Sequence, residues 1–286
     1  MSVERIIEPK RSFLKIDLKE IWKFRELFYI FAWRDIKVRY KQTALGVIWV
    51  ILQPLISTFV FTVFFGRMAG VPSGDLPYPL FVLIGLVFWG FFSGSLNTAS
   101  NSLVSNEHII KKVYFPRIIL PLAAIVTSSV DFLVNLTLLF ILGLFFGFLP
   151  NLATIPLILL AIFFTATSAA GVSLFFAAFN VKYRDVRYVL PFIFQTLMFL
   201  TPVIYPLSIV SPRNQLLMAF NPMTSVIEIV RQIFSGNLNL NFTLIGISFI
   251  STIIFSFIGL HYFKKTEYQF ADIAQYGTNN QGQQNI

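Results

Sequence analysis

The fold is decided by residues 31–55, which read FAWRDIKVRYKQTALGVIWVILQPL. The first half of this stretch carries four cations within eight positions, namely Arg34, Lys37, Arg39 and Lys41. The second half is apolar and uncharged, and it begins a run long enough to cross a bilayer, because about 20 helical residues span ~30 Å of hydrocarbon. A basic aromatic segment joined to such a run predicts a membrane protein with a surface helix before its first span.

The composition of the whole chain supports an integral membrane protein. Of its 286 residues, 56% are hydrophobic and only 12% are charged, and the mean hydropathy is +0.74. An ordinary soluble domain has about a quarter of its residues charged. Apolar runs predict six spans, at residues 45–66, 79–100, 120–149, 152–179, 188–205 and 242–263. We therefore expect an all-α protein with a cytoplasmic segment 1–44, a transmembrane domain 45–263 and a cytoplasmic tail 264–286.

The placement of the basic residues predicts the topology. Nineteen of the 22 Lys and Arg residues lie before residue 45, in 101–117, in 180–187 or after residue 263. The alternate loops hold only Arg67, Arg213 and Arg231. Under the positive-inside rule both termini are cytoplasmic. The net charge of +9 then serves orientation and contact with anionic lipid, so we expect membrane lipids and no nucleic acid as partners.

The segment before the first span predicts an amphipathic helix at the membrane interface. Between residues 21 and 40, apolar side chains recur at near-helical spacing, beside a stripe formed by Arg34, Lys37 and Lys41. Such a helix would place its aromatic side among the lipid headgroups and its cations near phosphate. The alternative is a plain basic anchor that only orients the first span.

Polar residues inside two predicted spans are candidates for a functional path. Gln53 and Pro54 lie near the middle of the first span, and proline leaves a carbonyl that lipid cannot satisfy, so this face should meet protein or a wet cavity. In the third span, Thr127, Asp131 and Asn135 share one helical face. An ionisable group at that depth suggests a functional site, whereas the alternative is a polar clamp between helices.

The region after the fifth span predicts an external re-entrant structure. TPVIYP, residues 201–206, should end the helix, because it contains two prolines. NPMTSVIEIVRQIF then begins at Asn221, with a proline after a possible cap and a possible capping box at Ser225 and Glu228. A helix this short cannot cross the membrane. We favour a re-entrant pair of short helices, and a surface helix is the alternative.

The loop at residues 101–117, NSLVSNEHIIKKVYFPR, combines basic and aromatic side chains with a helical centre. This mixture suits docking onto another protein, although the loop could be an ordinary connector.

Several kinds of chemistry are missing from the sequence. ATP hydrolysis needs a glycine-rich phosphate loop with its lysine, yet no Gly-Lys pair exists anywhere in the chain. Cysteine is absent and there are only two histidines, so we expect no metal site. No paired catalytic carboxylates are visible, and we expect no catalytic residues and no cofactor.

Aromatic side chains make up 17% of the residues, and aromatic rings can stack on the apolar faces of sugars. Most of them must serve lipid contact or helix packing. Our candidates for lining a channel are Trp49, Gln53, Phe59, Phe88, Phe92, Asp131, Phe199 and Tyr205.

Six segments together resemble the permease subunits of bacterial ABC exporters of lipid-linked polysaccharides, the O-antigen, capsule and teichoic acid exporters. They are RDIKVRYKQTALGVIWVILQPL, IIKKVYFPRIILPL, KYRDVRYVLPF, TPVIYP, NPMTSVIEIVR and KKTEYQFAD, and they cover nearly the whole chain in the order of that family.

The resemblance implies a homodimeric channel in the bacterial plasma membrane, driven by two copies of a separate ATPase subunit that binds ATP and Mg²⁺. The substrate would be a glycan on an undecaprenyl diphosphate-type lipid. Alternatives are a permease that exports another amphipathic lipid or a small molecule and, in a different class, a passive channel or scaffold.

The resemblance also implies roles for three groups of residues. Arg34, Lys37, Arg39 and Lys41 would meet the lipid diphosphate. Asn221, Pro222, Glu228 and Arg231 would belong to an external gate. Contact with the ATPase would involve Glu107, His108, Ile109, Ile110, Lys111, Lys112, Tyr114, Phe115 and Arg117.

Overall fold

A computed structural model describes residues 18–41, 46–183 and 185–267 of the chain. Everything described is helix, turn or irregular backbone, with no strand in these ranges. The helices are α1 (Leu18–Lys23), α2 (Arg25–Lys41), α3 (Gly46–Phe61) with its π-helical extension η1 (Thr62–Met68), α4 (Tyr78–Ser105), α5 (Glu107–Ile110), α6 (Ile119–Phe146), η2 (Leu152–Thr154), α7 (Ile155–Lys182), α8 (Val186–Leu200), η3 (Leu207–Ile209), α9 (Pro212–Met218), α10 (Pro222–Ser235) and α11 (Phe242–Thr266).

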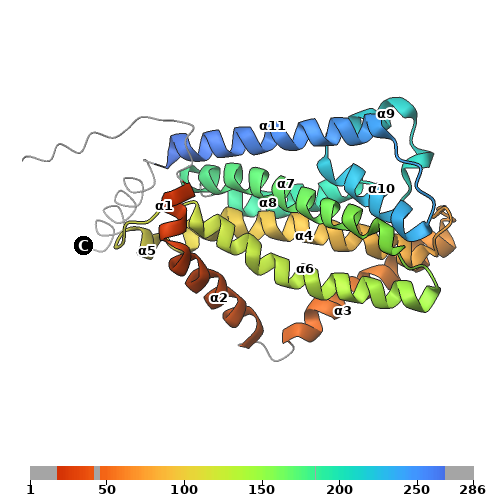
Figure 1. Cartoon of the computed structure of the whole chain (residues 1–286), viewed down its shortest axis with the longest axis horizontal. Coiled ribbons are helices and arrows are strands. Elements are labelled where there is room, and N and C mark those ends of the chain that lie inside the picture. Colours follow the sequence, from red (N-terminus) through yellow and green to blue (C-terminus); the bar gives the residue numbers. More distant parts are fainter. Residues whose placement is uncertain (1–17, 42–45, 184, 268–286) are drawn as a thin grey trace, which may run out of the picture.

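Helix α4 forms the centre of a bundle with α6, α7, α8 and α11 (Figure 1). In its most apolar 18-residue window, 72% of the residues are buried, whereas only 6% are buried in the corresponding window of residues 48–68, which overlap the span predicted at 45–66. Helix α3 is therefore peripheral, and most of its apolar surface is available to lipid or to another protein.

Five of the predicted spans are confirmed as helices long and apolar enough to cross a membrane, at residues 48–68, 78–105, 119–146, 152–182 and 242–266. The remaining one, predicted at 188–205, is the 15-residue helix α8, which ends at Leu200. The helix ends there because Pro202 and Pro206 interrupt the segment, as the sequence predicts. That α8 completes a sixth crossing stays a prediction.

Helix α10 is inserted into the bundle and does not lie on its surface. Met223, Val226, Ile227 and Val230 are at most 1% exposed and belong to the same core as α4. The alternative of a surface helix is therefore wrong. Its start is also earlier than the capping box predicts, since Asn221 is the N-cap and accepts a hydrogen bond from the backbone N–H of Met223.

The predicted capping box at Ser225 and Glu228 is wrong. Ser225 lies inside α10, where its hydroxyl donates to the carbonyl of Leu244 and shares a hydrogen bond with Ser248. The serine thus joins α10 to α11.

Helices α7 and α11 pack closely through small residues. A Cβ atom added to Gly259 would lie 1.9 Å from the carbonyl oxygen of Gly171, so neither backbone could stay in place. Ser168 and Thr252 share a hydrogen bond across the same contact. Small residues allow close approach where no hydrophobic effect drives helices together in lipid.

The two ends of the bundle differ in character. Helices α1 and α5 and the last turn of α11 lie at one end, and α9 lies at the other (Figure 1). At the first end, Phe31 and Ala32 of α2 join a buried cluster that includes Phe115, Ile119 and Phe263. Residues 1–17 and 42–44 of the predicted N-terminal segment, Leu45 and Arg184 of the predicted transmembrane domain, and residues 268–286 of the predicted tail lie outside the described residues.

Candidate functional site

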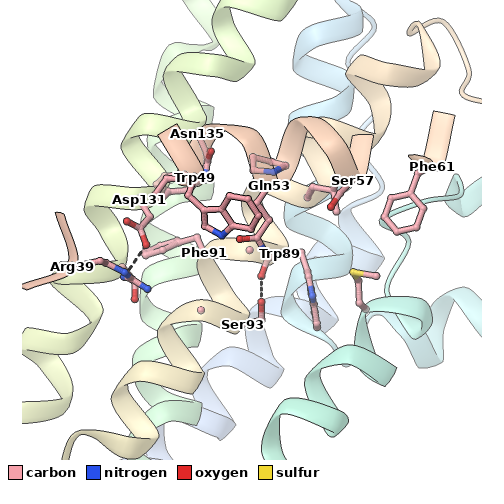
Figure 2. Close-up of a pocket in the computed structure, with 18 of the residues that line it drawn as sticks. Arg39, Trp49, Gln53, Ser57, Phe61, Trp89, Phe91, Ser93, Asp131 and Asn135 are labelled. Atoms are coloured by element: carbon pink, nitrogen blue, oxygen red, sulfur yellow. Dashed lines mark hydrogen bonds and ion pairs between the residues drawn. The ribbon is translucent and has the colours of Figure 1, made fainter. Parts of the chain in front are cut away.

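A cavity of about 860 Å³ lies between α3, α4 and α6 (Figure 2). Its lining joins aromatic side chains to amides, hydroxyls and one ion pair. The lining residues used below are Arg39, Trp49, Gln53, Pro54, Ser57, Trp89, Phe91, Ser93, Asp131 and Asn135.

The polar face of α3 points into this cavity. Gln53, Pro54 and Ser57 all line it, although the remainder of α3 is largely apolar. The proline leaves one helical carbonyl without its donor, and a polar cavity is where such a group is tolerated within a membrane. The sequence argument from Gln53 and Pro54 is thus confirmed.

An ion pair between α2 and α6 lies at the edge of the cavity. Arg39 Nη1 is 2.7 Å from Asp131 Oδ2, and the Tyr40 hydroxyl donates a hydrogen bond to Asp131 Oδ1. Burial, and then the hydrogen bond to Asp131, raises the pKa of the Tyr40 phenol, so its hydroxyl stays protonated and donates. The carboxylate of Asp131 thus contacts two consecutive side chains of α2.

This contact lies far from the end of the bundle at which α6 begins. Asp131 lies 12 residues after Ile119, the start of α6, which corresponds to about 18 Å along the helix axis. Phe31, earlier in α2, shares a buried cluster with Ile119 itself. Helix α2 therefore runs along α6 from its end towards its middle, and its polar contacts satisfy Asp131 at a depth where an isolated carboxylate would be costly.

The four cations expected to meet a diphosphate are in different environments. Arg34 is 2.7 Å from Asp35 and donates to the side chain of Asn106 at the end of α4. Arg39 pairs with Asp131. Lys37 and Lys41 are exposed. Of the four, only Arg39 lines the cavity.

The cavity can satisfy hydrogen-bonding ligands that also present apolar faces. Asn135 Oδ1 is buried and has no hydrogen-bond partner among the described atoms, although it lies on the cavity wall. Trp49 is 52% exposed, so the indole surface is available from α3. Aromatic faces beside amides and hydroxyls are typical of sites that bind sugars or polar headgroups.

The predicted channel residues divide into three groups. Trp49, Gln53 and Asp131 line the cavity together. Phe88 and Phe92 are buried in the core, where Phe88 packs edge-on against Phe132.

The other three lie away from the cavity wall. Phe59 and Phe199 are exposed on the outside, and the Tyr205 hydroxyl donates to the carbonyl of Phe199.

The loop after α4 presents an exposed surface at the α1 end of the bundle. His108, Lys111, Lys112 and Tyr114 are exposed, whereas Phe115 is only 3% exposed and packs against Phe31. Glu107 and Lys111 form an ion pair at 2.9 Å. Ile109 and Ile110 pack against the same buried cluster as Phe115.

Two further contacts tie this loop to its neighbours. The Tyr114 hydroxyl donates to Glu20 of α1, and Arg117 donates to the backbone carbonyl and the carboxylate of Glu267, just after α11. Partial burial, followed by the carboxylates of Glu20 and Glu267, raises the pKa of Tyr114.

Arg231, predicted for an external gate, is a buried structural residue of α10. Its guanidinium donates to the carbonyls of Phe81, Pro202 and Val203 at 3.3, 2.7 and 2.6 Å. It also lies 3.4 Å from the centroid of the Phe81 ring. Arg231 thereby fixes the non-helical segment that follows α8. Asn221 and Pro222 begin α10, and Glu228 lies beside a second, smaller pocket near Ser208.

Comparison with known proteins identifies the family of this helical arrangement. The model of the ABC-2 type transporter family matches residues 26–235, from the start of α2 to the end of α10. The chain belongs to the ABC-2 type transporter family.

Curated relatives of this ABC-2 type transporter cover most of its length. The O-antigen export system permease protein RfbA of Klebsiella pneumoniae is 29% identical over 252 residues, which are 87% of this chain and 95% of the relative. RfbA of Myxococcus xanthus is 29% identical, over 76% of this chain and 83% of the relative. The polysialic acid transport protein KpsM of Escherichia coli is 22% identical, over 82% and 91% respectively.

Sequence reasoning missed the contribution of α4 to the cavity of this ABC-2 type transporter. Trp89, Gly90, Ser93 and Gly94 line the cavity, whereas Phe88, predicted in their place, faces the core. A signal was present, because the small and hydroxyl residues at 90, 93 and 94 share one helical face. Sequence reasoning also did not identify Arg39 and Tyr40 as the partners of Asp131, although their contact from α2 to α6 agrees with the alternative of a polar clamp between helices.

Proposed function

We propose that this chain is the channel-forming permease of an ABC exporter that moves a lipid-linked polysaccharide across the plasma membrane. The observation that carries the proposal is the cavity, in which aromatic and amide side chains adjoin Arg39 in a chain of this family. A saccharide would use the ring faces and amides, and an anionic lipid head would use the arginine. The names of the curated relatives, which export O-antigen or transport polysialic acid, point to the same class of substrate.

The energy source in this proposal is a separate ATPase subunit, present in two copies. The family is that of ABC transporters, and the sequence offers no Gly-Lys pair of its own for a phosphate loop. The exposed basic and aromatic side chains of the loop around Lys112 and Tyr114 would contact that subunit. ATP and Mg²⁺ would then be bound by the partner, and this chain would need no cofactor.

The proposed assembly contains two copies of the permease, with both termini in the cytoplasm of a bacterium. The largely unburied α3 supports contact with a second copy or with lipid, because its side chains Ile48, Leu52, Ile56 and Phe59 are exposed. The distribution of Lys and Arg supports the orientation.

Depletion of the protein tests the substrate class. We expect undecaprenyl-linked glycans to accumulate on the cytoplasmic side, measured by mass spectrometry of extracted lipids, and to clear when the gene is restored. An unchanged glycan-lipid profile would contradict polysaccharide export and favour another amphipathic substrate. A passive channel or scaffold would instead be indicated if the purified chain never associated with an ATPase subunit.

A further inference from the structure

We propose that Asp131 is an internal anion that occupies Arg39 in the resting state and is displaced by the anionic head of the substrate. The ion pair is then an autoinhibitory contact, which keeps α2 fixed to α6 until a substrate arrives. This inference rests on the proposed function, because it takes the substrate to carry a diphosphate. The inference adds to the proposed function the step by which the diphosphate gains access to Arg39.

The geometry places Asp131 where it would compete with an anionic ligand for Arg39. Both Arg39 and Asp131 line the cavity, and they are 2.7 Å apart (Figure 2). Their side chains are 38% and 23% exposed, so the pair is accessible from the cavity side. Any anion that reaches Arg39 through the cavity must replace or share the carboxylate.

The chemistry favours exchange over permanent pairing. A diphosphate carries more charge and more acceptor oxygens than one carboxylate, and a guanidinium can donate to two of those oxygens at once. Asp131 lines the polar cavity and its side chain is 23% exposed, so its carboxylate can be hydrated from the cavity after α2 leaves. The displaced carboxylate is therefore not left unsatisfied at mid-helix.

The remainder of α2 is held elsewhere, which confines the change to one end of the helix. Phe31 packs against Phe115 with ring centroids 5.7 Å apart, and Arg34 donates to Asn106. Release at Asp131 would leave α2 attached at this end, next to the loop that we propose contacts the ATPase. Binding of substrate in the cavity would thus be transmitted to that loop through a single helix, α2.

Binding measurements on Asp131→Asn test the inference. The substitution removes the charge but keeps the shape and an acceptor for Tyr40. The full-length permease in lipid nanodiscs would be titrated with undecaprenyl diphosphate, and with undecaprenol as the uncharged probe. We expect Asp131→Asn to bind the diphosphate about threefold to tenfold more tightly than the wild type. Binding of undecaprenol should not change. Asp75→Asn, which neutralises an exposed carboxylate in the loop before α4, is the matched control and should behave as the wild type.

The outcomes separate the inference from the proposed function. If the wild type prefers the diphosphate and Asp131→Asn binds it equally or more weakly, the internal competitor is refuted while diphosphate recognition stands. If neither protein prefers the diphosphate over undecaprenol, diphosphate recognition itself fails, and the inference fails with it. If Asp75→Asn also binds the diphosphate more tightly, and to the same degree, the tighter binding is explained by the change in net charge. That result would also refute the internal competitor.

A second measurement leaves the ion pair intact, so it does not depend on the folding of Asp131→Asn. Because the chain has no cysteine, spin labels can be placed at Val38→Cys on α2 and Leu133→Cys on α6, which are both exposed. We expect undecaprenyl diphosphate, but not undecaprenol, to lengthen or broaden the distance distribution between the labels. An unchanged distribution with bound diphosphate would show that α2 is not released.

Discussion

Two charged residues inside the helical bundle, Asp131 and Arg231, are accommodated in different ways. Asp131 forms an ion pair with Arg39 and accepts a hydrogen bond from Tyr40, so both of its partners are side chains of another helix. Arg231 is only 4% exposed and donates to backbone carbonyls of Phe81, Pro202 and Val203, which no side-chain rotation can remove. The first arrangement suits a switch and the second suits a permanent joint.

Arg231→Met should destabilise the fold strongly. Methionine retains apolar volume but leaves the carbonyls of Pro202 and Val203 without donors, and each buried unsatisfied group costs about 1–3 kcal/mol. We expect a clear fall in the thermal unfolding midpoint of the detergent-solubilised protein. Arg213→Met on α9, where the arginine is exposed, is the matched control and should leave the midpoint within a degree or two of wild type. Equal midpoints for the two variants would refute the structural role of Arg231.

The neighbours Tyr114 and Phe115 should separate ATPase contact from folding. Tyr114 is 80% exposed and Phe115 is 3% exposed, so Tyr114→Ala should leave the amount of folded permease unchanged and weaken its association with the ATPase. Phe115→Ala should lower the amount of folded permease, because it removes a buried ring at a cost of about 3–5 kcal/mol. Co-purification of the ATPase, normalised to folded permease, measures both effects. Undiminished co-purification and ATPase stimulation with Tyr114→Ala would exclude this residue from the contact.

At the scale of elements, helix contacts in this protein depend on small residues as much as on large apolar ones. The contact of α7 with α11 uses Gly171 and Gly259, and the contact of α10 with α11 uses Ser225 and Ser248. Helix α3, by contrast, has little buried surface in one copy of the chain. The bundle of α4, α6, α7, α10 and α11 therefore contains these close contacts, and α2 and α3 lie against it.

Gly259→Ala should disrupt the α7–α11 contact although it adds one methyl group. The new Cβ would lie 1.9 Å from a backbone oxygen, so the helices must separate. Gly246→Ala on the same helix meets nothing within 4 Å and is the matched control. We expect a lower thermal midpoint for Gly259→Ala alone. A similar midpoint for both variants would mean that the two helices are not in such close contact.

The sequence predicts these elements well and their side-chain partners poorly, for physical reasons. Length and hydropathy are local properties, so five spans and the end of α8 near Pro202 could be predicted. The sequence could not predict that Trp89 lines the cavity while Phe88 is buried in the core. These two residues are adjacent, and which of them faces the cavity depends on how the helix is rotated about its axis. Likewise, the pairing of Asp131 with Arg39 joins residues 92 positions apart, and no local pattern contains that information.

At the scale of the whole molecule, the two ends of the bundle have different chemistry. Basic residues gather in the segments at the end that holds α1, α5 and the last turn of α11, while the end that holds α9 has few of them. This asymmetry fits a protein that meets anionic lipid and a partner subunit on one side. It predicts that the α1 end faces the cytoplasm.

Cysteine labelling tests this orientation directly, since the chain contains no cysteine of its own. Single cysteines would replace Ser73 or Asn237 in the segments of the α9 end, and Ser105 or Tyr183 in those of the α1 end. In intact cells, a maleimide that cannot cross the membrane should label the first two positions and miss the others, and all four should react after the membrane is permeabilised. This second step is the control, because it shows that an unlabelled cysteine was shielded by the bilayer and not by protein. Labelling of positions 105 and 183 in intact cells, with 73 and 237 protected, would reverse the orientation and remove Tyr114 from the side where ATP is available.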